Sequence, residues 1–262
     1  MEKIKKAVIL KDKIIVELEP SKENYVELLN IISLENTNNV EIDLNILKED
    51  IEGKIRRLDF HKINMGIEFY KRYKDVLKEI KINFDEIEKC NFSFGYSVLI
   101  LKVFKDLELN GLERIRKLVE KSLDYRYDSP QGFEELLSCG EKDLAIKLMK
   151  KTIVCLCGKP FFLDAINDTF ANGMKNVIDP NVFLNVLRIV QIIYSNNLES
   201  SFEKEIEMLR EKIYNAINIY SHNTLSALKN MLVSEYYREF GMIILKILND
   251  ENLKRRILEQ LL

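Results

Sequence analysis

Cysteines and histidines are the residues of this sequence best suited to metal binding or nucleophilic chemistry, and their spacing favours neither. No CxxC pair occurs, and the histidines stand far from the thiols along the chain. Structural zinc sites usually draw their ligands from closely spaced pairs of these residue types. We therefore expect no metal site. The residues concerned are Cys90, Cys139, Cys155, Cys157, His61 and His222.

The same thiols are predicted to be free and mostly shielded. Cys155 and Cys157 lie in a helical run, where positions i and i+2 point to different faces of the helix. A disulfide between them would therefore have poor geometry.

Other residues that could take part in catalysis are explained by ordinary structural roles. Carboxylates cluster at Glu134-Glu135 and along residues 203–207, and general acid–base chemistry would need them to converge in a pocket. Solvated helix faces explain these clusters better. Gly158-Lys159-Pro160 lacks the GxxxxGK[ST] frame of a phosphate loop, and no GxSxG elbow occurs. We expect a protein without catalytic activity and without a cofactor.

Composition indicates a large helical core. The chain has 262 residues, 47% of them hydrophobic, and only 9 glycines and 4 prolines, few for a protein built from many turns. Charged residues make up 31% with a net charge of −2, and basic residues alternate with acidic ones along most helical segments. Nucleic-acid binding needs phosphate-neutralising cations gathered on one face, so we do not expect it.

Targeting signals are not evident in the printed sequence. MEKIKKAVIL offers only four apolar residues before Lys11, short of a signal-peptide core, and no hydrophobic run reaches membrane length. The last residues do not form a KDEL-like tail. These observations predict a cytoplasmic protein without membrane insertion, or one in the lumen of the endoplasmic reticulum if a leader has been removed.

Hydrophobic periodicity divides the chain into an appendage and a helical body. Two short apolar runs within residues 7–18 predict a β-hairpin or strand pair, followed by a helix after Ser21, so residues 1–40 are interpreted as an N-terminal appendage. Residues 41–262 repeat a helical spacing throughout. The predicted helices include 62–80, 84–90, 93–108, 111–125, 130–138, 142–157, 160–171, 180–194, 201–220, 223–237, 238–249 and 252–262.

Breaks between these helices recur roughly every thirty residues, which is typical of helical repeats. They lie near Gly111, Gly140, Gly173 and Asn196. The sequence therefore predicts an all-α fold, an armadillo/HEAT-like helical-repeat solenoid with a short N-terminal strand pair.

Three segments carry a resemblance to a known family. Met149–Ile178 combines an apolar helical run, the break at Gly158, a second amphipathic helix and a stop at Gly173. Leu58–Lys71 places His61 and Gly66 five residues apart, and Val186–Tyr194 adds a third helical segment. Together these segments resemble the armadillo units of the Sil/Fes/HspBP family, most closely its Sil branch. Members of this family are nucleotide-exchange factors for DnaK/BiP-class heat-shock chaperones.

The resemblance implies a co-chaperone. Such a protein binds the ATPase domain of a BiP/DnaK-class chaperone and promotes ADP release, because it prefers the opened form of that domain. The alternative, from a different functional class, is a helical-repeat interaction scaffold without exchange activity.

Candidate partner-binding residues lie on the helix predicted over 180–194. Val182, Val186, Leu187, Val190 and Ile193 supply its buried side. Its polar side carries a stripe that an armadillo stack would turn toward the binding groove. This stripe consists of Asn181, Asn185, Arg188 and Gln191. His61, beside Phe60 and Ile63, is a further candidate contact, although a packed or capping histidine is the simpler interpretation.

Overall fold

The computed structural model of the chain describes residues 7–10, 13–16, 44–123, 130–171, 180–219, 221–235 and 237–259. Within these ranges only the backbone is described at residues 7–10, 13–16, 46, 168–171, 180–181, 219, 221–225 and 256–259. The described part of the body, from Leu44 on, is all-helical. The chain divides into two compact units, residues 1–123 and residues 124–262. The predicted boundary near residue 40 lies outside the described residues, and the sequence did not indicate the division after Leu123.

Near the N-terminus, strands β1 (Ala7–Leu10) and β2 (Lys13–Val16) pair antiparallel, with Ala7 opposite Val16 and Leu10 opposite Lys13. The helix predicted after Ser21 falls on residues outside the described ranges.

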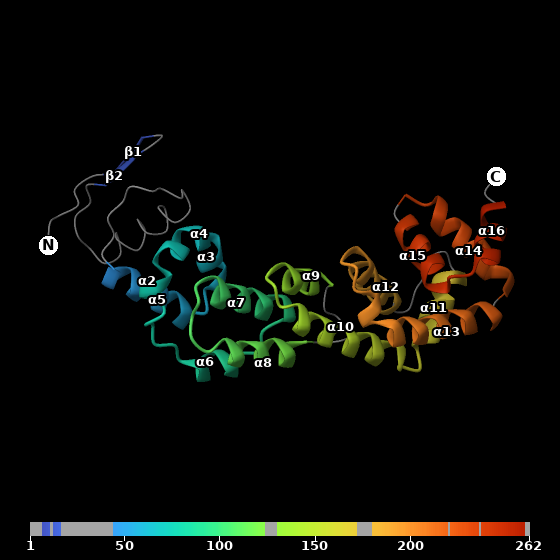
Figure 1. Cartoon of the computed structure of the whole chain (residues 1–262), viewed down its shortest axis with the longest axis horizontal. Helices are drawn as coiled ribbons and strands as arrows, with labels where there is room; N and C mark the ends of the chain where they lie inside the picture. The colour runs from blue at the N-terminus through green and yellow to red at the C-terminus, as the bar shows by residue number, and fades with distance from the viewer. Residues whose placement is uncertain are drawn as a thin grey trace. The chain divides into compact units, whose positions relative to one another are not determined.

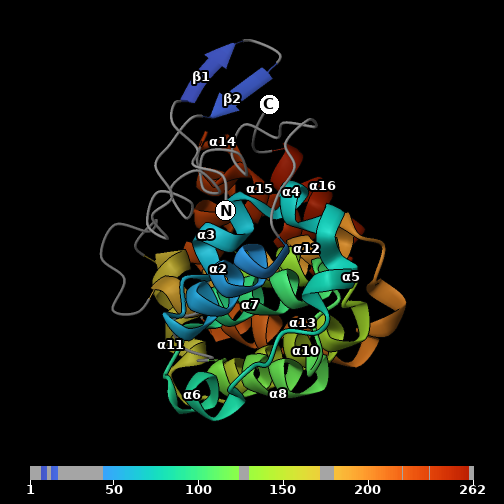
Figure 2. The ribbon, with the colours of Figure 1, turned by 90° about the vertical axis from the view of Figure 1, so that its left-hand side faces the viewer.

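Short and medium helices make up the described body of the first unit (Figure 1). α7 packs on both α3 and α8, and α2 packs on α3 and α5. α6 lies beside α8 in both views of the ribbon (Figure 2), held by Arg114, whose guanidinium pairs with Glu88 at 2.6 Å and with Asp85 at 3.2 Å. The elements are α2 (Leu44–Arg56), α3 (Phe60–Met65), α4 (Ile67–Tyr70), η1 (Lys71–Tyr73), α5 (Lys74–Leu77), α6 (Phe84–Lys89), α7 (Phe94–Asp106) and α8 (Leu112–Ser122).

One prediction is wrong here: residues 62–80 do not form a single helix. The chain breaks at Gly66 and again at η1 before α5 begins. Phe69 and Tyr70, both in the short helix α4, are fully buried. The backbone leaves helical geometry at Gly66 (φ −97°, ψ 15°) and at Tyr73 (φ −112°, ψ 15°), and the low helix propensity of glycine favours the first of these breaks.

A buried polar cluster lies in this core. The Lys54 ammonium donates to Asp50 Oδ2 at 2.7 Å and to the Tyr70 hydroxyl at 2.6 Å, and all three residues are buried. Burial lowers the pKa of Lys54, and the Asp50 carboxylate opposes that shift. Asp50 Oδ1 has no hydrogen-bond partner among the described residues.

A surface cluster ties α5 to the turn after α7. The Glu108 carboxylate pairs with Lys74 and, at 2.5 Å, with Lys78. The hydrogen bonds from Lys74 and then from Lys78 lower the pKa of Glu108 to about 2. Glu108 also has a positive φ of 51°, which a residue in a tight turn adopts only when the surrounding contacts favour it.

This cluster predicts an acid-dependent loss of stability in the first unit. Because the folded pKa lies below the ordinary value of 4.5, the stabilisation is present above that value and disappears as pH falls toward about 2. Glu108→Gln should therefore melt below wild type at pH 6, and the two melting temperatures should converge as the pH is lowered. Thermal denaturation followed by circular dichroism measures both. A gap that stays constant down to pH 2 would contradict this assignment.

Longer helices form the second unit, in which α12 packs on α9, α10, α11 and α15, and α14 packs on α11 and α15. The predicted helices over 130–138, 142–157, 160–171 and 180–194 are confirmed to within two residues at each end. The elements are α9 (Gln131–Ser138), α10 (Lys142–Cys157), α11 (Phe162–Ala171), α12 (Pro180–Ser195), η2 (Glu199–Ser201), α13 (Glu203–Ile219), α14 (Ser221–Val233), α15 (Arg238–Leu248) and α16 (Glu251–Glu259).

Burial along α12 follows its sequence pattern. The five apolar residues predicted for its core side are all fully buried, so this prediction is confirmed. Pro180 occupies the first helical position, where its missing N–H costs nothing. Gly173, one of the predicted breaks, lies outside the described residues.

None of the helices in the described ranges is long and apolar enough to cross a membrane.

Candidate functional site

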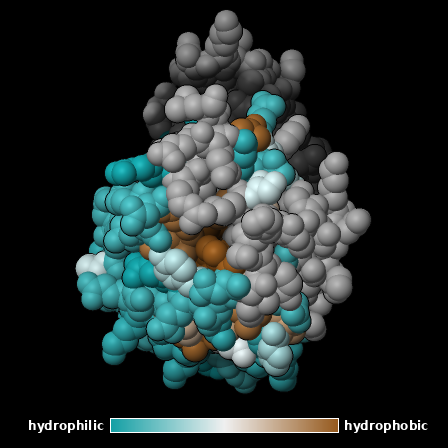
Figure 3. Space-filling model, turned by 90° about the vertical axis from the view of Figure 1, so that its right-hand side faces the viewer, coloured by the Kyte–Doolittle hydropathy of each residue, from teal (hydrophilic) through white to brown (hydrophobic). Residues whose placement is uncertain are grey.

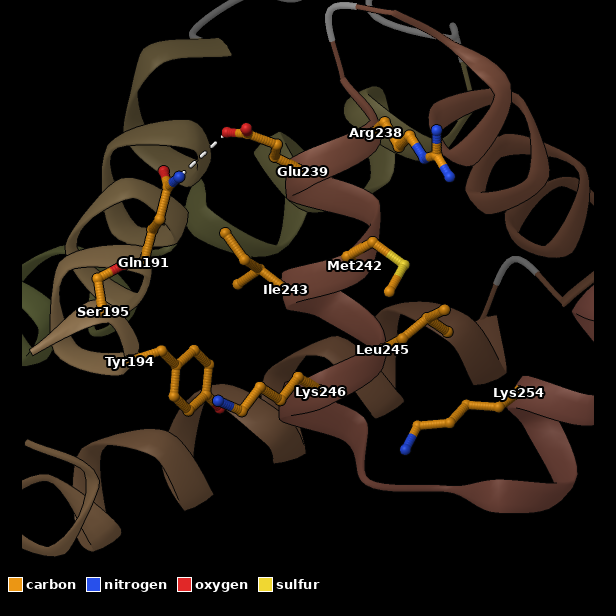
Figure 4. A pocket seen from close by; sticks show the side chains of 10 residues that line it. All are labelled: Gln191, Tyr194, Ser195, Arg238, Glu239, Met242, Ile243, Leu245, Lys246 and Lys254. Atoms are coloured by element: carbon orange, nitrogen blue, oxygen red, sulfur yellow. Dashed lines mark hydrogen bonds between the residues drawn. The ribbon is translucent and has the colours of Figure 1, made fainter. Parts of the chain in front are cut away.

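An exposed, mostly apolar groove of the second unit lies along α15. It has a volume of about 670 Å³ and runs over the outer face of α15 between α12 and α16 (Figure 4). Ten residues line it: Gln191, Tyr194 and Ser195 from α12, Arg238, Glu239, Met242, Ile243, Leu245 and Lys246 from α15, and Lys254 from α16. We call this feature the α15 groove.

Helix α15 is apolar on nearly every side, which a helix covered by neighbours requires. Gly241 lets α14 approach closely, since an added Cβ would meet the Leu232 side chain at 3.0 Å. Asn249 ends the helix with a positive φ of 50°, a conformation that Asn tolerates. Arg210 donates to the Ile247 carbonyl at 2.7 Å, satisfying one of the last carbonyls of the helix. These contacts fix α15 against α13 and α14.

Met242 forms the exposed centre of the groove. Its side chain is 56% exposed, whereas the adjacent Ile243 and Leu245 are buried. Seen from one end of the molecule, hydrophobic side chains are exposed in patches among predominantly hydrophilic ones (Figure 3). An exposed apolar side chain at the centre of a concave surface is typical of a recognition site.

Polar groups border the groove on the α12 side. The Gln191 amide donates to the Glu239 carboxylate at 3.0 Å. The Lys246 ammonium lies 3.6 Å from the centre of the Tyr194 ring and 3.5 Å from the Glu199 carboxylate. Burial, and then the nearby Glu199, raise the pKa of Tyr194, so its hydroxyl stays protonated at neutral pH.

Cations border the side turned toward α16. Arg238 and Lys254 lie on this side of Met242 (Figure 4). Arg238 is exposed and has no ion-pair partner among the described residues, whereas Lys254 pairs with Glu251 at 2.6 Å. The lining thus carries three cations and one carboxylate, although the whole chain has a net charge of −2.

Two residues of the predicted stripe lie against α15. Arg188 is exposed and its guanidinium lies 6.0 Å from the centre of the Phe240 ring, and Gln191 lines the groove itself. Asn185 is half-buried, and of Asn181 only its place in α12 is described. The stripe is therefore partly engaged within the unit, and its one member in the groove is Gln191.

His61 belongs to the other unit and lies apart from this site in the sequence. It is exposed on α3, and its ring centre lies 5.1 Å from that of Tyr96. The Tyr96 hydroxyl donates to the Leu58 carbonyl. His61 is thus packed against an aromatic ring at the surface of the first unit.

Sequence reasoning missed Met242, Arg238 and Lys246. Nothing in the apolar sequence of α15 distinguishes Met242 from its buried neighbours. The basic cluster Lys254-Arg255-Arg256 is visible in the sequence, and together with Gln191 of the predicted stripe it points toward this surface.

No lining residue is a cysteine or a histidine, so the groove offers apolar contact, charge and hydrogen bonds. Among the residues that the structure describes, no group of three or more His, Cys, Asp or Glu is arranged to hold a metal ion.

The four cysteines are free thiols, as the sequence predicts, with Cys157 buried and the other three half-buried. Burial raises the pKa of Cys157 to about 12. Because the thiolate is the reactive form, Cys157 should be alkylated by iodoacetamide at pH 8 more slowly than Cys155, two residues away. Peptide mass spectrometry over a time course measures both sites. Equal labelling rates would show that the end of α10 opens in solution.

Comparison with known proteins adds no relative: the sequence matches no protein-family model, no curated protein and no solved structure.

Proposed function

We propose that this chain is a non-catalytic, protein-binding helical module that holds its partner in the α15 groove. The observation that carries this proposal is the 56% exposure of Met242 on a helix whose other apolar residues are buried. The groove has a volume of about 670 Å³, which falls in the usual range of small binding sites. An apolar centre with a polar rim is also the usual anatomy of a protein interface.

The helices would stack as armadillo/HEAT-like repeats, with the N-terminal strand pair as an appendage. All-helical architecture and short connections support this arrangement. Repeat proteins of this kind commonly act by binding, because each added repeat extends the surface available to a partner.

Exchange activity toward a chaperone is the more specific form of this proposal. It rests on the resemblance of Met149–Ile178, Leu58–Lys71 and Val186–Tyr194 to the Sil branch. In this form the partner is the ATPase domain of a BiP/DnaK-class chaperone, and binding lowers the affinity of that domain for ADP. The α15 groove suits a single helix, whereas nucleotide exchange needs a surface shaped for a globular lobe. The groove therefore favours the simpler scaffold function over exchange activity.

The groove is tested by paired substitutions of exposed apolar residues. Met242→Glu places a charge in the groove, whereas Val154→Glu places one on α10 at a side chain that is 50% exposed. Partners captured from a native extract by wild type and confirmed by direct binding should be retained by Val154→Glu and lost by Met242→Glu. Identical capture by both variants would exclude the α15 groove as the binding site.

Exchange is tested separately with chaperone ATPase domains loaded with fluorescent ADP. Acceleration of ADP release with increasing protein would establish exchange activity, and tighter binding to the nucleotide-free form must accompany it. A flat dose response with cytosolic and lumenal chaperones alike would remove the exchange function and leave the binding module.

A further inference from the structure

We infer that the α15 groove receives an amphipathic helix whose apolar face is flanked by acidic side chains. This inference rests on the proposed function, because it names the chemistry of the partner that the same groove would bind. It is carried by the position of three cations around one exposed methionine.

Spacing along α15 sets the pattern of the occupant. Arg238 and Lys246 lie eight residues apart, about 12 Å along the helix axis, and Met242 lies midway between them. The surface of α15 therefore alternates cation, apolar side chain and cation. A facing helix matches this alternation with carboxylates about two turns apart and a large apolar residue between them.

Existing ion pairs leave these cations available. Arg238 has no ion-pair partner among the described residues, and a cation in the first turn of a helix is disfavoured by the helix dipole. Lys254 pairs with the exposed Glu251, and Lys246 pairs with the half-buried Glu199 while lying over the Tyr194 ring. Surface ion pairs of this kind are weak enough to be exchanged for a partner's carboxylate.

The single carboxylate of the lining gives the occupant an orientation. Glu239 lies on the α12 side, where it accepts a hydrogen bond from Gln191. Arg238 and Lys254 lie on the α16 side (Figure 4). The more acidic flank of the bound helix therefore faces α16. On the α12 side the lining carries both Glu239 and Lys246, so that flank of the bound helix places a hydrogen-bond donor beside Glu239 and a single carboxylate beside Lys246. A nucleic-acid backbone fits less well, because it would set phosphates against Glu239 and leave Met242 exposed to water.

The probes are two labelled peptides of about 15 residues, long enough to form a helix on binding. They share one apolar stripe and differ only in flanks of Glu or Lys. Fluorescence anisotropy with the full chain should give a Kd about tenfold lower for the Glu peptide, and added salt should shrink the difference. Arg238→Glu/Lys254→Glu should reverse the preference. The control Lys142→Glu/Lys204→Glu, at exposed positions of α10 and α13, should preserve it, and circular dichroism confirms folding of each variant.

Three results would overturn the inference. Equal affinity for both peptides means that the groove selects apolar faces without regard to charge, and the proposed function stands if Met242→Glu abolishes both. Absence of binding by either peptide excludes a helical occupant, while the capture experiment with Met242→Glu still decides the proposed function independently. Tighter binding of a single-stranded oligonucleotide, lost in Arg238→Glu/Lys254→Glu, assigns the surface to nucleic acid instead.

Discussion

Lys54→Ala is expected to destabilise the first unit by about 3–5 kcal/mol, because it leaves the Asp50 carboxylate buried without its cation. Asp50, Lys54 and Tyr70 are all buried, and Asp50 Oδ1 already has no partner among the described residues. Urea denaturation gives the free energy of unfolding.

Hydrogen exchange locates the effect. The two units have separate cores, so amide protection should fall in α2 to α5 and persist in α10 to α15. A matched apolar replacement, Asp50→Leu/Lys54→Met/Tyr70→Phe, removes every polar member of the cluster and should recover most of the lost stability. If Lys54→Ala had the same urea midpoint as wild type, the cluster would have to be hydrated in solution.

Gly111→Ala is expected to destabilise the same unit by about 2–4 kcal/mol. Gly111 has a positive φ of 88°, and an added Cβ would lie 2.0 Å from the Phe84 ring. That ring cannot move easily, because the Arg114 guanidinium stacks 4.7 Å from its centre and the Phe104 ring lies 6.0 Å away.

Gly95→Ala is the matched control. An added Cβ at Gly95 meets nothing within 4 Å, and alanine favours the helical conformation, so the expected change is a gain of about 0.5 kcal/mol. The comparison uses the shift in the urea midpoint for each variant. Equal destabilisation by both substitutions would contradict the steric explanation.

Local pattern predicted most of the helices, since their limits depend on residues near one another in sequence. The helix over 142–157 matches α10, and the apolar face of α12 is buried as predicted. Residues 62–80 were predicted as one helix because their apolar spacing continues across Gly66, and apolar spacing alone does not show where the backbone leaves helical geometry.

Groups that meet across the fold were less predictable. Asp50 and Lys54 have the i, i+4 spacing of an ordinary surface pair, and only the approach of Tyr70 distinguishes them as buried. In the groove, Gln191 meets Glu239 across 48 residues of sequence, a pairing that periodicity cannot show. Of the residues in the predicted stripe on α12, Gln191 lines the α15 groove. Met242, at the centre of the groove, was not predicted.

The packing of α12 has a consequence for the kinetics of recognition. This helix forms one wall of the α15 groove and also packs on α9, α10 and α11, so that wall cannot yield without disturbing the core. A preorganised site loses little conformational entropy on binding. The ordering cost would then fall on an occupant that is unstructured when free, and sequence changes that raise the intrinsic helicity of that occupant should lengthen the lifetime of the complex.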